Sequence, residues 1–391
     1  MDSAMLQLKK KVVHGHKVIS SRYLQAASLV NVRMKWVKDK ELDDVVAREK
    51  DLKAVCHLKD RICGSSKSCL PIWELSRRRR QMGLDVRVSS FMRRYPTIFE
   101  EFTIGNASGS VPWFRLTEEA VLLHQEECRY LHEQGPQLVE SLCKLLMLSK
   151  GMTLPLQTIE QLRWDMGLED KDYAHCYPHL FERVCLEDGR EALKLLCWDD
   201  HLAVPALIKS SSSSLTGEIC STASAALSFP VKFTRGFGLK KKCMSWLREW
   251  QTLPYSSPYA DPSHLDRRTD VSEKRIVGVF HELLHLTIQG KTERRNLSNL
   301  RAPLQLPQKF TKVFGRHPGI FYISRKGGIE TVILREAYDG FNLVHKHPLA
   351  ELRNKYAQLM RLGFLNRSRG LYKKDVEIKT EKLESPQEYL V

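Results

Sequence analysis

The chain has 391 residues, of which 62 are Lys or Arg and 46 are Asp or Glu, so its formal net charge is +16. Apolar residues make up 42% and charged residues 28% of the sequence, a balance that excludes wholesale disorder and is typical of a globular protein with more than one compact unit. No run of about 18 uncharged apolar residues occurs, which excludes a transmembrane helix.

The positive charge is concentrated in four windows, at residues 1–38, 61–94, 229–250 and 291–316, and the remainder of the chain is net acidic. Local basicity of this kind favours dedicated surfaces for an anionic partner, either a nucleic acid or a membrane surface, over a generally basic exterior. For any single Lys or Arg, the simpler interpretation is that it solvates a helix face.

The N-terminal window contains no acidic residue from Ser3 to Lys38 and alternates basic residues with short apolar stretches. An acid-free, basic and amphipathic N-terminus is typical of an organelle import sequence, and its few hydroxyl residues favour the mitochondrion over the chloroplast. An ordinary basic first helix is the alternative that these residues leave open. We expect an import sequence over residues 1–30 and a folded region from residue 31.

An internal repeat organises the folded region. An aromatic residue or His, then Pro, one further residue, Ile or Leu, and Phe occur at Tyr95–Phe99, Tyr177–Phe181 and His317–Phe321. Apolar residues precede each motif at nearly constant spacing, at Leu75 and Leu84, Ile159 and Leu168, and Leu297 and Leu306. Three matches of this kind predict three copies of one structural unit, which we call the first, second and third copy.

Each copy predicts a helix, a short turn, a second helix that ends at the proline, and then a β-hairpin with Gly-containing turn residues. This is the outline of a winged-helix-like unit. We therefore expect an α+β fold, mainly α, in which three repeated helix-turn-helix plus β-hairpin units are joined by longer helices. The three copies are expected at about residues 72–116, 156–198 and 294–336.

Three connecting segments have their own patterns. Thr117 and the two glutamates after it predict the start of a linking helix that ends at Gly135-Pro136. The Ser-rich stretch 209–228 predicts a flexible insertion, and residues 366–391 predict a charged C-terminal tail.

Clustered arginines are the first candidate RNA contacts. Four successive arginines spread around a helix, so at least two of them face solvent and reach phosphates. In the first copy the candidates are Arg77, Arg78, Arg79 and Arg80 on the first helix and Arg93 and Arg94 on the second. The first helix of the third copy carries Arg294 and Arg295, whereas the second copy is acidic and is expected to be structural or to contact protein.

The stretch from Phe229 to Trp250 mixes aromatic and basic residues. Aromatic rings that stack on bases beside cations that neutralise phosphates suit single-stranded RNA. Trp246 and Trp250 are individually expected in the core. The remaining candidates are Arg235, Lys240, Lys241 and Lys242 as backbone contacts and Phe237 as a stacking residue.

The sequence His281-Glu282-Leu283-Leu284-His285 matches the H-E-x-x-H pattern. Two imidazoles one helical turn apart bind zinc in metallopeptidases, and the Glu between them polarises a bound water. A catalytic site also needs a third protein ligand, and the extended pattern would place a His where Lys291 stands. A zinc metallopeptidase is therefore the least favoured function, and we expect no metal and no catalytic residue.

Long motifs at Arg93–Phe102, Phe229–Gly238, Val279–Leu284 and Arg316–Tyr322 resemble the plant organelle RNA recognition (PORR) domain family, and within it a mitochondrial member of the WHAT'S THIS FACTOR group. The resemblance covers roughly residues 30–365. It implies a non-enzymatic RNA-binding protein without a cofactor that promotes group II intron splicing in a plant organelle. The implied partner is organellar intron RNA, single-stranded or structured, with other splicing factors of a ribonucleoprotein as further partners and no membrane.

We therefore expect the protein to bind and stabilise folded intron RNA, because neutralised phosphates and held unstacked segments favour the productive RNA fold. An organellar DNA-binding or transcription-related protein is the alternative, since helix-turn-helix units also bind DNA. The expected location is the mitochondrion, with the chloroplast as the alternative.

Overall fold

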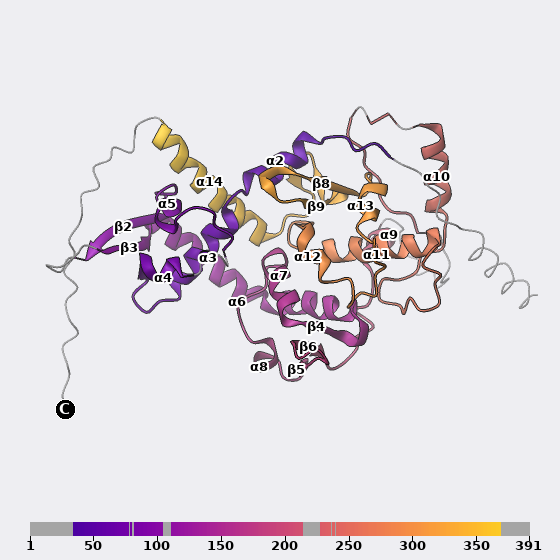
Figure 1. Ribbon diagram of the computed structural model, residues 1–391, viewed down its shortest axis with the longest axis horizontal. Coiled ribbons are helices and arrows are strands. Elements are labelled where there is room, and N and C mark those ends of the chain that lie inside the picture. Colours follow the sequence, from indigo (N-terminus) through magenta and orange to yellow (C-terminus); the bar gives the residue numbers. More distant parts are fainter. Residues whose placement is uncertain are drawn as a thin grey trace, which may run out of the picture. The chain divides into compact units, whose positions relative to one another are not determined.

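The computed structural model describes residues 34–368, apart from residues 78, 80–81, 105–110, 214–226, 236 and 239 (Figure 1). The described chain divides into two compact units. We call them the large unit, residues 34–46 and 136–345, and the small unit, residues 47–135 and 346–368. The predicted import sequence and almost all of the predicted tail lie outside the described residues.

The small unit contains the first copy. Its helices are α3 (Leu52–Cys63), α4 (Ile72–Ser76), α5 (Val88–Met92) and α14 (Pro348–Ser368). Its strands are β1 (Cys69–Pro71), β2 (Phe99–Ile104) and β3 (Val111–Leu116), which form an antiparallel sheet in the order β1-β3-β2. Helix α14 packs on the first copy, since the Thr97 hydroxyl donates to the Leu359 carbonyl over 2.7 Å and the rings of Tyr95 and Phe364 lie 5.4 Å apart.

The large unit contains the second and third copies. Its helices are α2 (Lys40–Arg48, whose last two residues lie in the small unit), α7 (Leu156–Met166), α8 (Tyr173–Cys176), α9 (Ala206–Ser213), α10 (Lys241–Gln251), α11 (Asp270–His285), α12 (Arg294–Ser298) and α13 (Lys312–Arg316). Three 3-10 turns are η1 (Lys150–Met152), η2 (Lys326–Gly328) and η3 (Arg335–Ala337). Its strands are β4 (Thr153–Pro155), β5 (Phe181–Cys185), β6 (Glu191–Leu195), β7 (Lys291–Glu293), β8 (Phe321–Ser324), β9 (Thr331–Leu334), β10 (Tyr338–Asp339) and β11 (Asn342–Leu343).

The three copies share one sheet topology, because β4-β6-β5 and β7-β9-β8 repeat the strand order of β1-β3-β2. In each copy a three-residue strand leads directly into the first helix, and the two later strands form a hairpin. A residue with positive φ precedes each short strand, at Ser68, Met152 and Gly290. The α+β class is thus confirmed, with small antiparallel sheets among many helices.

The turn after each first helix is also repeated. Its residue with left-handed φ is in turn Gly83 (67°), Gly167 (70°) and Gln305 (54°). The N–H of the leucine that follows donates to an arginine carbonyl five residues earlier, at Arg79 (3.2 Å), Arg163 (2.9 Å) and Arg301 (2.8 Å). In the second copy this turn caps α7, whereas in the first and third copies α4 and α12 end at Ser76 and Ser298 and the left-handed residue follows further along the chain.

The proline motifs have equivalent hydrogen bonds as well. The N–H groups of Phe99, Phe181 and Phe321 each donate over 3.0 Å to the carbonyl of the residue before the proline, which is Tyr95, Tyr177 or His317. Each phenylalanine is buried and pairs across the hairpin with a leucine of the last strand. The spacing found in the sequence therefore corresponds to repeated backbone contacts.

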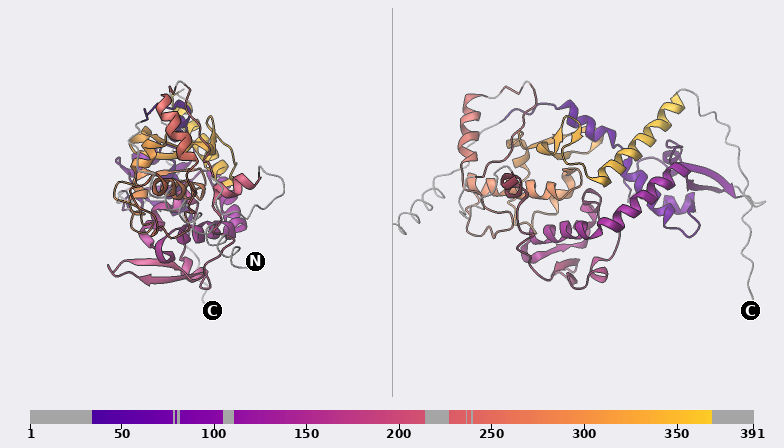
Figure 2. Two further views of the ribbon diagram at one scale, coloured as in Figure 1. Left: turned by 90° about the vertical axis from the view of Figure 1, so that its right-hand side faces the viewer. Right: turned by 180° about the vertical axis from the view of Figure 1, so that it is seen from behind.

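The predicted end of the linking helix at Gly135-Pro136 is wrong. Helix α6 runs from Glu118 in the small unit to Met147 in the large unit and includes Pro136 (Figure 2). A proline inside a helix removes one hydrogen bond, but Leu142, Leu145 and Leu146 beyond it are fully buried. Burial of this apolar face outweighs the lost hydrogen bond.

The Ser-rich stretch begins as a helix, since α9 extends to Ser213 and the hydroxyls of Ser210 and Ser211 donate to the Leu207 carbonyl over 3.0 and 2.8 Å. Residues 214–226 of this stretch lie outside the described residues. No helix in the described part of the chain is long and apolar enough to cross a membrane.

Gly319 of the third proline motif gives a stability prediction. A Cβ atom there would press on Val231 and lie 2.9 and 3.0 Å from two ring carbons of Phe233, and the Gly319 carbonyl accepts the Lys232 N–H over 2.8 Å. We expect Gly319→Ala to lower the free energy of unfolding by about 1–3 kcal/mol through overpacking, measured by chemical denaturation.

The matched control is Gly315→Ala, because nothing lies within 4 Å of a Cβ atom at this exposed helical glycine. It is expected to leave stability unchanged or slightly higher. Equal effects of the two substitutions would contradict the packing of residues 231–233 against the third copy.

Candidate nucleic-acid interface

In the first copy, Arg77 and Arg79 are exposed, but α4 ends at Ser76, so their predicted position on the first helix is wrong and they lie in the turn that follows it. The guanidinium carbon of Arg77 lies 5.3 Å from the centroid of the Trp73 ring, a cation–π contact with an indole that is 54% exposed. Arg79 instead holds the turn, since its Nε and Nη2 donate to the carbonyls of Leu84 and Asp85 over 3.1 and 2.7 Å. The candidates Arg78 and Arg80 lie outside the described residues.

The second helix of the first copy is followed by the other two arginines. Arg93 is exposed but donates two hydrogen bonds of 2.6 Å to the carboxylate of Glu101 on β2, and these bonds raise the pKa of the guanidinium. Arg94 is half-buried. RNA phosphates would therefore compete with Glu101 for Arg93.

In the large unit, Arg235, Lys240, Lys241 and Lys242 are all exposed, the last two in the first turn of α10. Within the described part of the chain, none of these four side chains forms an ion pair. Phe237 is half-buried and stacks on Phe233, with ring centroids 4.8 Å apart and planes 30° apart. One face of the candidate stacking residue is therefore already covered.

The tryptophans of α10 are core residues, as predicted. Trp246 and Trp250 are buried, and the ring of Trp250 lies 4.3 Å from that of His317 in the third proline motif. The helix is thus anchored to the third copy through its aromatic face, and this anchoring leaves its basic N-terminal residues in solvent.

Arg294 and Arg295 begin α12 and are both neutralised locally. Arg294 pairs with Glu330 and Arg295 with Glu293. The equivalent turn hydrogen bonds match Arg79 of the first copy with Arg301 of the third. Arg77–Arg80 therefore correspond to residues after α12, whereas Arg294 and Arg295 lie at its start. The exposed Arg301 was not among the candidates, although the match of Leu84 with Leu306 already aligns it with Arg79 in the sequence.

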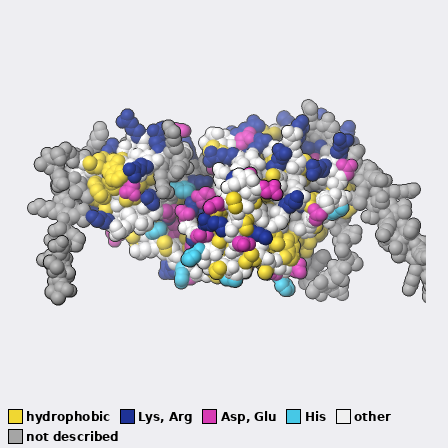
Figure 3. Space-filling view, turned by 60° about the horizontal axis from the view of Figure 1, so that its bottom comes forward, with side chains coloured by type: hydrophobic (Ala, Val, Ile, Leu, Met, Phe, Trp, Pro, Cys, Tyr) yellow, Lys and Arg dark blue, Asp and Glu magenta, His cyan; other side chains and the backbone are white. Residues whose placement is uncertain are grey.

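Lys and Arg side chains are numerous on the face shown in Figure 3, where they lie among acidic and hydrophobic side chains. The candidates of the first copy belong to the small unit, and the others belong to the large unit. Among the described candidates of the large unit, Arg235 and Lys240–Lys242 form no ion pair, and in the small unit Arg77 contacts an aromatic ring. Trp73 could not be predicted from the sequence as part of this surface, because a lone tryptophan in a short helix normally belongs to the core.

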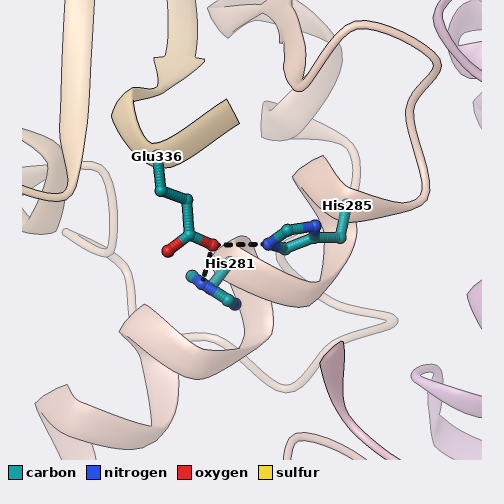
Figure 4. A group of neighbouring side chains, drawn as sticks. All are labelled: His281, His285 and Glu336. Carbon is teal, nitrogen blue, oxygen red and sulfur yellow. Dashed lines mark hydrogen bonds and ion pairs between the residues drawn. The ribbon is translucent and has the colours of Figure 1, made fainter. Parts of the chain in front are cut away.

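The H-E-x-x-H motif lies on α11, and the fold brings to its two histidines a carboxylate, Glu336, as the third group of a cluster that could hold a metal ion. Glu336 of η3 places Oε1 2.6 Å from Nε2 of both His281 and His285 (Figure 4). Glu336 could not be predicted as part of this cluster from the sequence, because it is distant from both histidines along the chain. His281 is only 2% exposed, and its burial lowers its pKa despite the adjacent carboxylate.

Glu282, which would be the catalytic base of a zinc peptidase, is fully committed elsewhere. Its carboxylate pairs with Lys144 Nζ over 2.6 Å and accepts hydrogen bonds from the Tyr259 hydroxyl over 2.7 Å and the Ala206 N–H over 2.6 Å. Burial raises its pKa, but the Lys144 ammonium and these hydrogen bonds outweigh burial and lower it. Glu282 thus joins α11 to α6 and α9 rather than activating water.

The family of the chain follows from comparison with known proteins. The family model described as the plant organelle RNA recognition domain matches residues 37–365. The chain therefore belongs to the plant organelle RNA recognition domain family. No solved structure matches it.

Among curated proteins, the chain is 36% identical to "Protein WHAT'S THIS FACTOR 9, mitochondrial" of Arabidopsis thaliana, over 96% of this chain and 100% of that protein. It is 33% identical to "Protein WHAT'S THIS FACTOR 1, chloroplastic" of Zea mays, over 86% of this chain and 68% of that protein. It is 28% identical to "Protein ROOT PRIMORDIUM DEFECTIVE 1" of Arabidopsis thaliana, over 83% of this chain and 82% of that protein. The full-length mitochondrial relative bears out the predicted mitochondrial location, and the chloroplastic relative matches the alternative.

The Glu336 cluster gives a pH-dependent prediction. Burial alone would raise the pKa of Glu336, but the hydrogen bonds from His281 and His285 outweigh burial and lower it to about 2, from an ordinary value of 4.5. A depressed carboxyl pKa contributes stability that is present above the ordinary value and lost as the pH falls toward 2. We therefore expect Glu336→Gln to be less stable than wild type at pH 7, with a difference in melting temperature that shrinks below about pH 4.5.

Thermal unfolding across pH measures this difference, and Glu330→Gln is the control because Glu330 pairs with arginine at the surface. A Glu336→Gln difference that stays constant from pH 7 to pH 3 would contradict an ionised Glu336 between the two imidazoles.

Proposed function

We propose that the protein binds organellar intron RNA in the mitochondrion and promotes group II intron splicing by stabilising the folded RNA, without catalytic chemistry or a cofactor of its own. The observation that carries the proposal is the family match over residues 37–365, since this family is described by RNA recognition in plant organelles. Residues 1–30 act as the import sequence in this proposal, and other splicing factors join the protein in a ribonucleoprotein.

The arrangement of the candidate residues supports a binding role. Group II introns fold into compact polyanions, so a protein stabilises them by placing fixed cations against closely spaced phosphates. The exposed lysines at the start of α10 and the exposed arginines of the first copy are suitable cations, and each of the two compact units carries one of these sets. Contacts at several sites on one chain strengthen binding beyond that of any single site.

The three copies serve as winged-helix-like units in this proposal. Each has two helices followed by a hairpin, and each sheet has the same strand order. The second helices, which enter the major groove in DNA-binding helix-turn-helix proteins, have only five, four and five residues in the three copies and offer few positions for reading base edges. This favours RNA over duplex DNA, the alternative that helix-turn-helix units allow.

The choice between RNA and DNA is tested by measuring the affinity of the full chain for single-stranded RNA and for duplex DNA of the same sequence at equal salt. We expect tighter binding to RNA. Equal or tighter binding to duplex DNA would favour the transcription-related alternative.

The basic start of α10 gives a more local prediction. Simultaneous replacement of Lys240, Lys241 and Lys242 by Ala should weaken RNA binding and reduce the slope of log affinity against log salt by about 2, because each phosphate contact contributes about 0.7 on single strands. The control is Arg190→Ala, since Arg190 is exposed in the second copy and paired with Asp188. An unchanged slope in the triple variant would remove α10 from the RNA-binding surface.

A further inference from the structure

The second and third copies contact each other through equivalent positions. The Lys150 N–H donates to the Pro303 carbonyl over 2.8 Å, and the Ile288 N–H donates to the Asp165 carbonyl over 2.9 Å. Lys150 and Ile288 are equivalent, because each lies the same number of residues before the turn leucine of its copy, Leu168 or Leu306. Asp165 and Pro303 are equivalent for the same reason. The two hydrogen bonds are therefore exchanged by an approximate twofold relation, as in an isologous dimer.

Side chains of the two first helices complete this contact. Asn299 Nδ2 donates to Gln161 Oε1 over 2.8 Å, and these two residues again occupy equivalent positions. Asp165 Oδ2 accepts hydrogen bonds from Thr292 Oγ1 over 2.5 Å and from Asn296 Nδ2 over 3.3 Å. Helices α7 and α12 thus cover the same face of each other.

The same face of the first copy has a different character. Arg77 occupies the position of Gln161 and Asn299, and its side chain is exposed. The main contacts of α4 are with α5, β1 and β3 of its own copy. At this position the second and third copies carry uncharged amides that hydrogen-bond to each other. The first copy instead carries a guanidinium that is exposed to solvent.

Trp73 lies one helical turn before Arg77 and is 54% exposed. The equivalent residues in the other copies, Gln157 and Arg295, are exposed and polar, so this position points to solvent in all three copies. Only the first copy carries an aromatic ring there. A single exposed hydrophobic side chain is common, but an exposed indole in cation–π contact with an exposed arginine combines a stacking surface with a phosphate ligand.

We infer that Trp73 and Arg77 form a binding site for single-stranded RNA, in which the indole stacks on a base and the guanidinium contacts an adjacent phosphate. The inference rests on the proposed RNA-binding function and assigns a residue pair to it. Charge complementarity selects this occupant, because residues 61–94 contain nine basic and two acidic side chains. Pairing with a second copy of the chain would set Arg77 against its own counterpart, which like-charge repulsion opposes.

The test uses the full chain and a fluorescently labelled single-stranded RNA of mixed sequence, with anisotropy measured over a range of salt concentrations. Trp73→Ala should weaken binding by about tenfold or more with an unchanged salt slope, because stacking is not a charge interaction. Trp73→Phe should retain most of the affinity. Arg77→Gln should weaken binding and lower the salt slope by about 0.7.

Trp198→Ala is the matched control, because Trp198 is a 43% exposed indole that follows the hairpin of the acidic second copy. It should bind RNA as wild type does. Wild-type affinity in Trp73→Ala would overturn this site and leave the proposed function standing, whereas failure of the wild-type chain to bind RNA would overturn the proposed function itself. Sedimentation of the wild-type chain and the same variants tests whether this face instead pairs with a second copy of the chain. A wild-type dimer that is lost in Trp73→Ala or Arg77→Gln would make this face a self-interface and contradict the inference.

Discussion

The left-handed turn that follows the first helix of each copy is the constraint on which the rest of the structure depends. It returns the chain toward a second helix, so that the hairpin closes on the short first strand. Because the carbonyl that accepts its hydrogen bond belongs to Arg79, Arg163 or Arg301, the turn also fixes where an arginine side chain leaves each copy. One backbone conformation therefore closes the turn and also determines the position of an arginine side chain in each copy.

The three copies have the same local structure but different roles. The second and third use the face of their first helices to pair with each other, through amides and an aspartate. The first carries Arg77 at this position, and its exposed ring and guanidinium suit RNA. The pairing of the second copy with the third agrees with a structural part, one of the two roles expected for the acidic second copy.

The repeat could be predicted from the sequence because its apolar and proline positions correspond to local hydrogen bonds within each copy. Features that depend on distant contacts could not. Helix α6 continues through Pro136 because leucines beyond the proline are buried by tertiary packing, and Glu336 reaches His281 and His285 only through the fold. The basic runs indicated charge but not its neutralisation, so Arg93, Arg294 and Arg295 proved to be paired with carboxylates.

The most direct test of the account is ultraviolet crosslinking of the full-length protein to RNA in isolated mitochondria, followed by sequencing of the bound fragments. The account predicts strong enrichment of group II intron segments over exons and other transcripts, reduced in a variant with Arg77 and Lys240–Lys242 neutralised. Bound fragments spread evenly over mitochondrial RNA, or recovery of DNA alone, would contradict it.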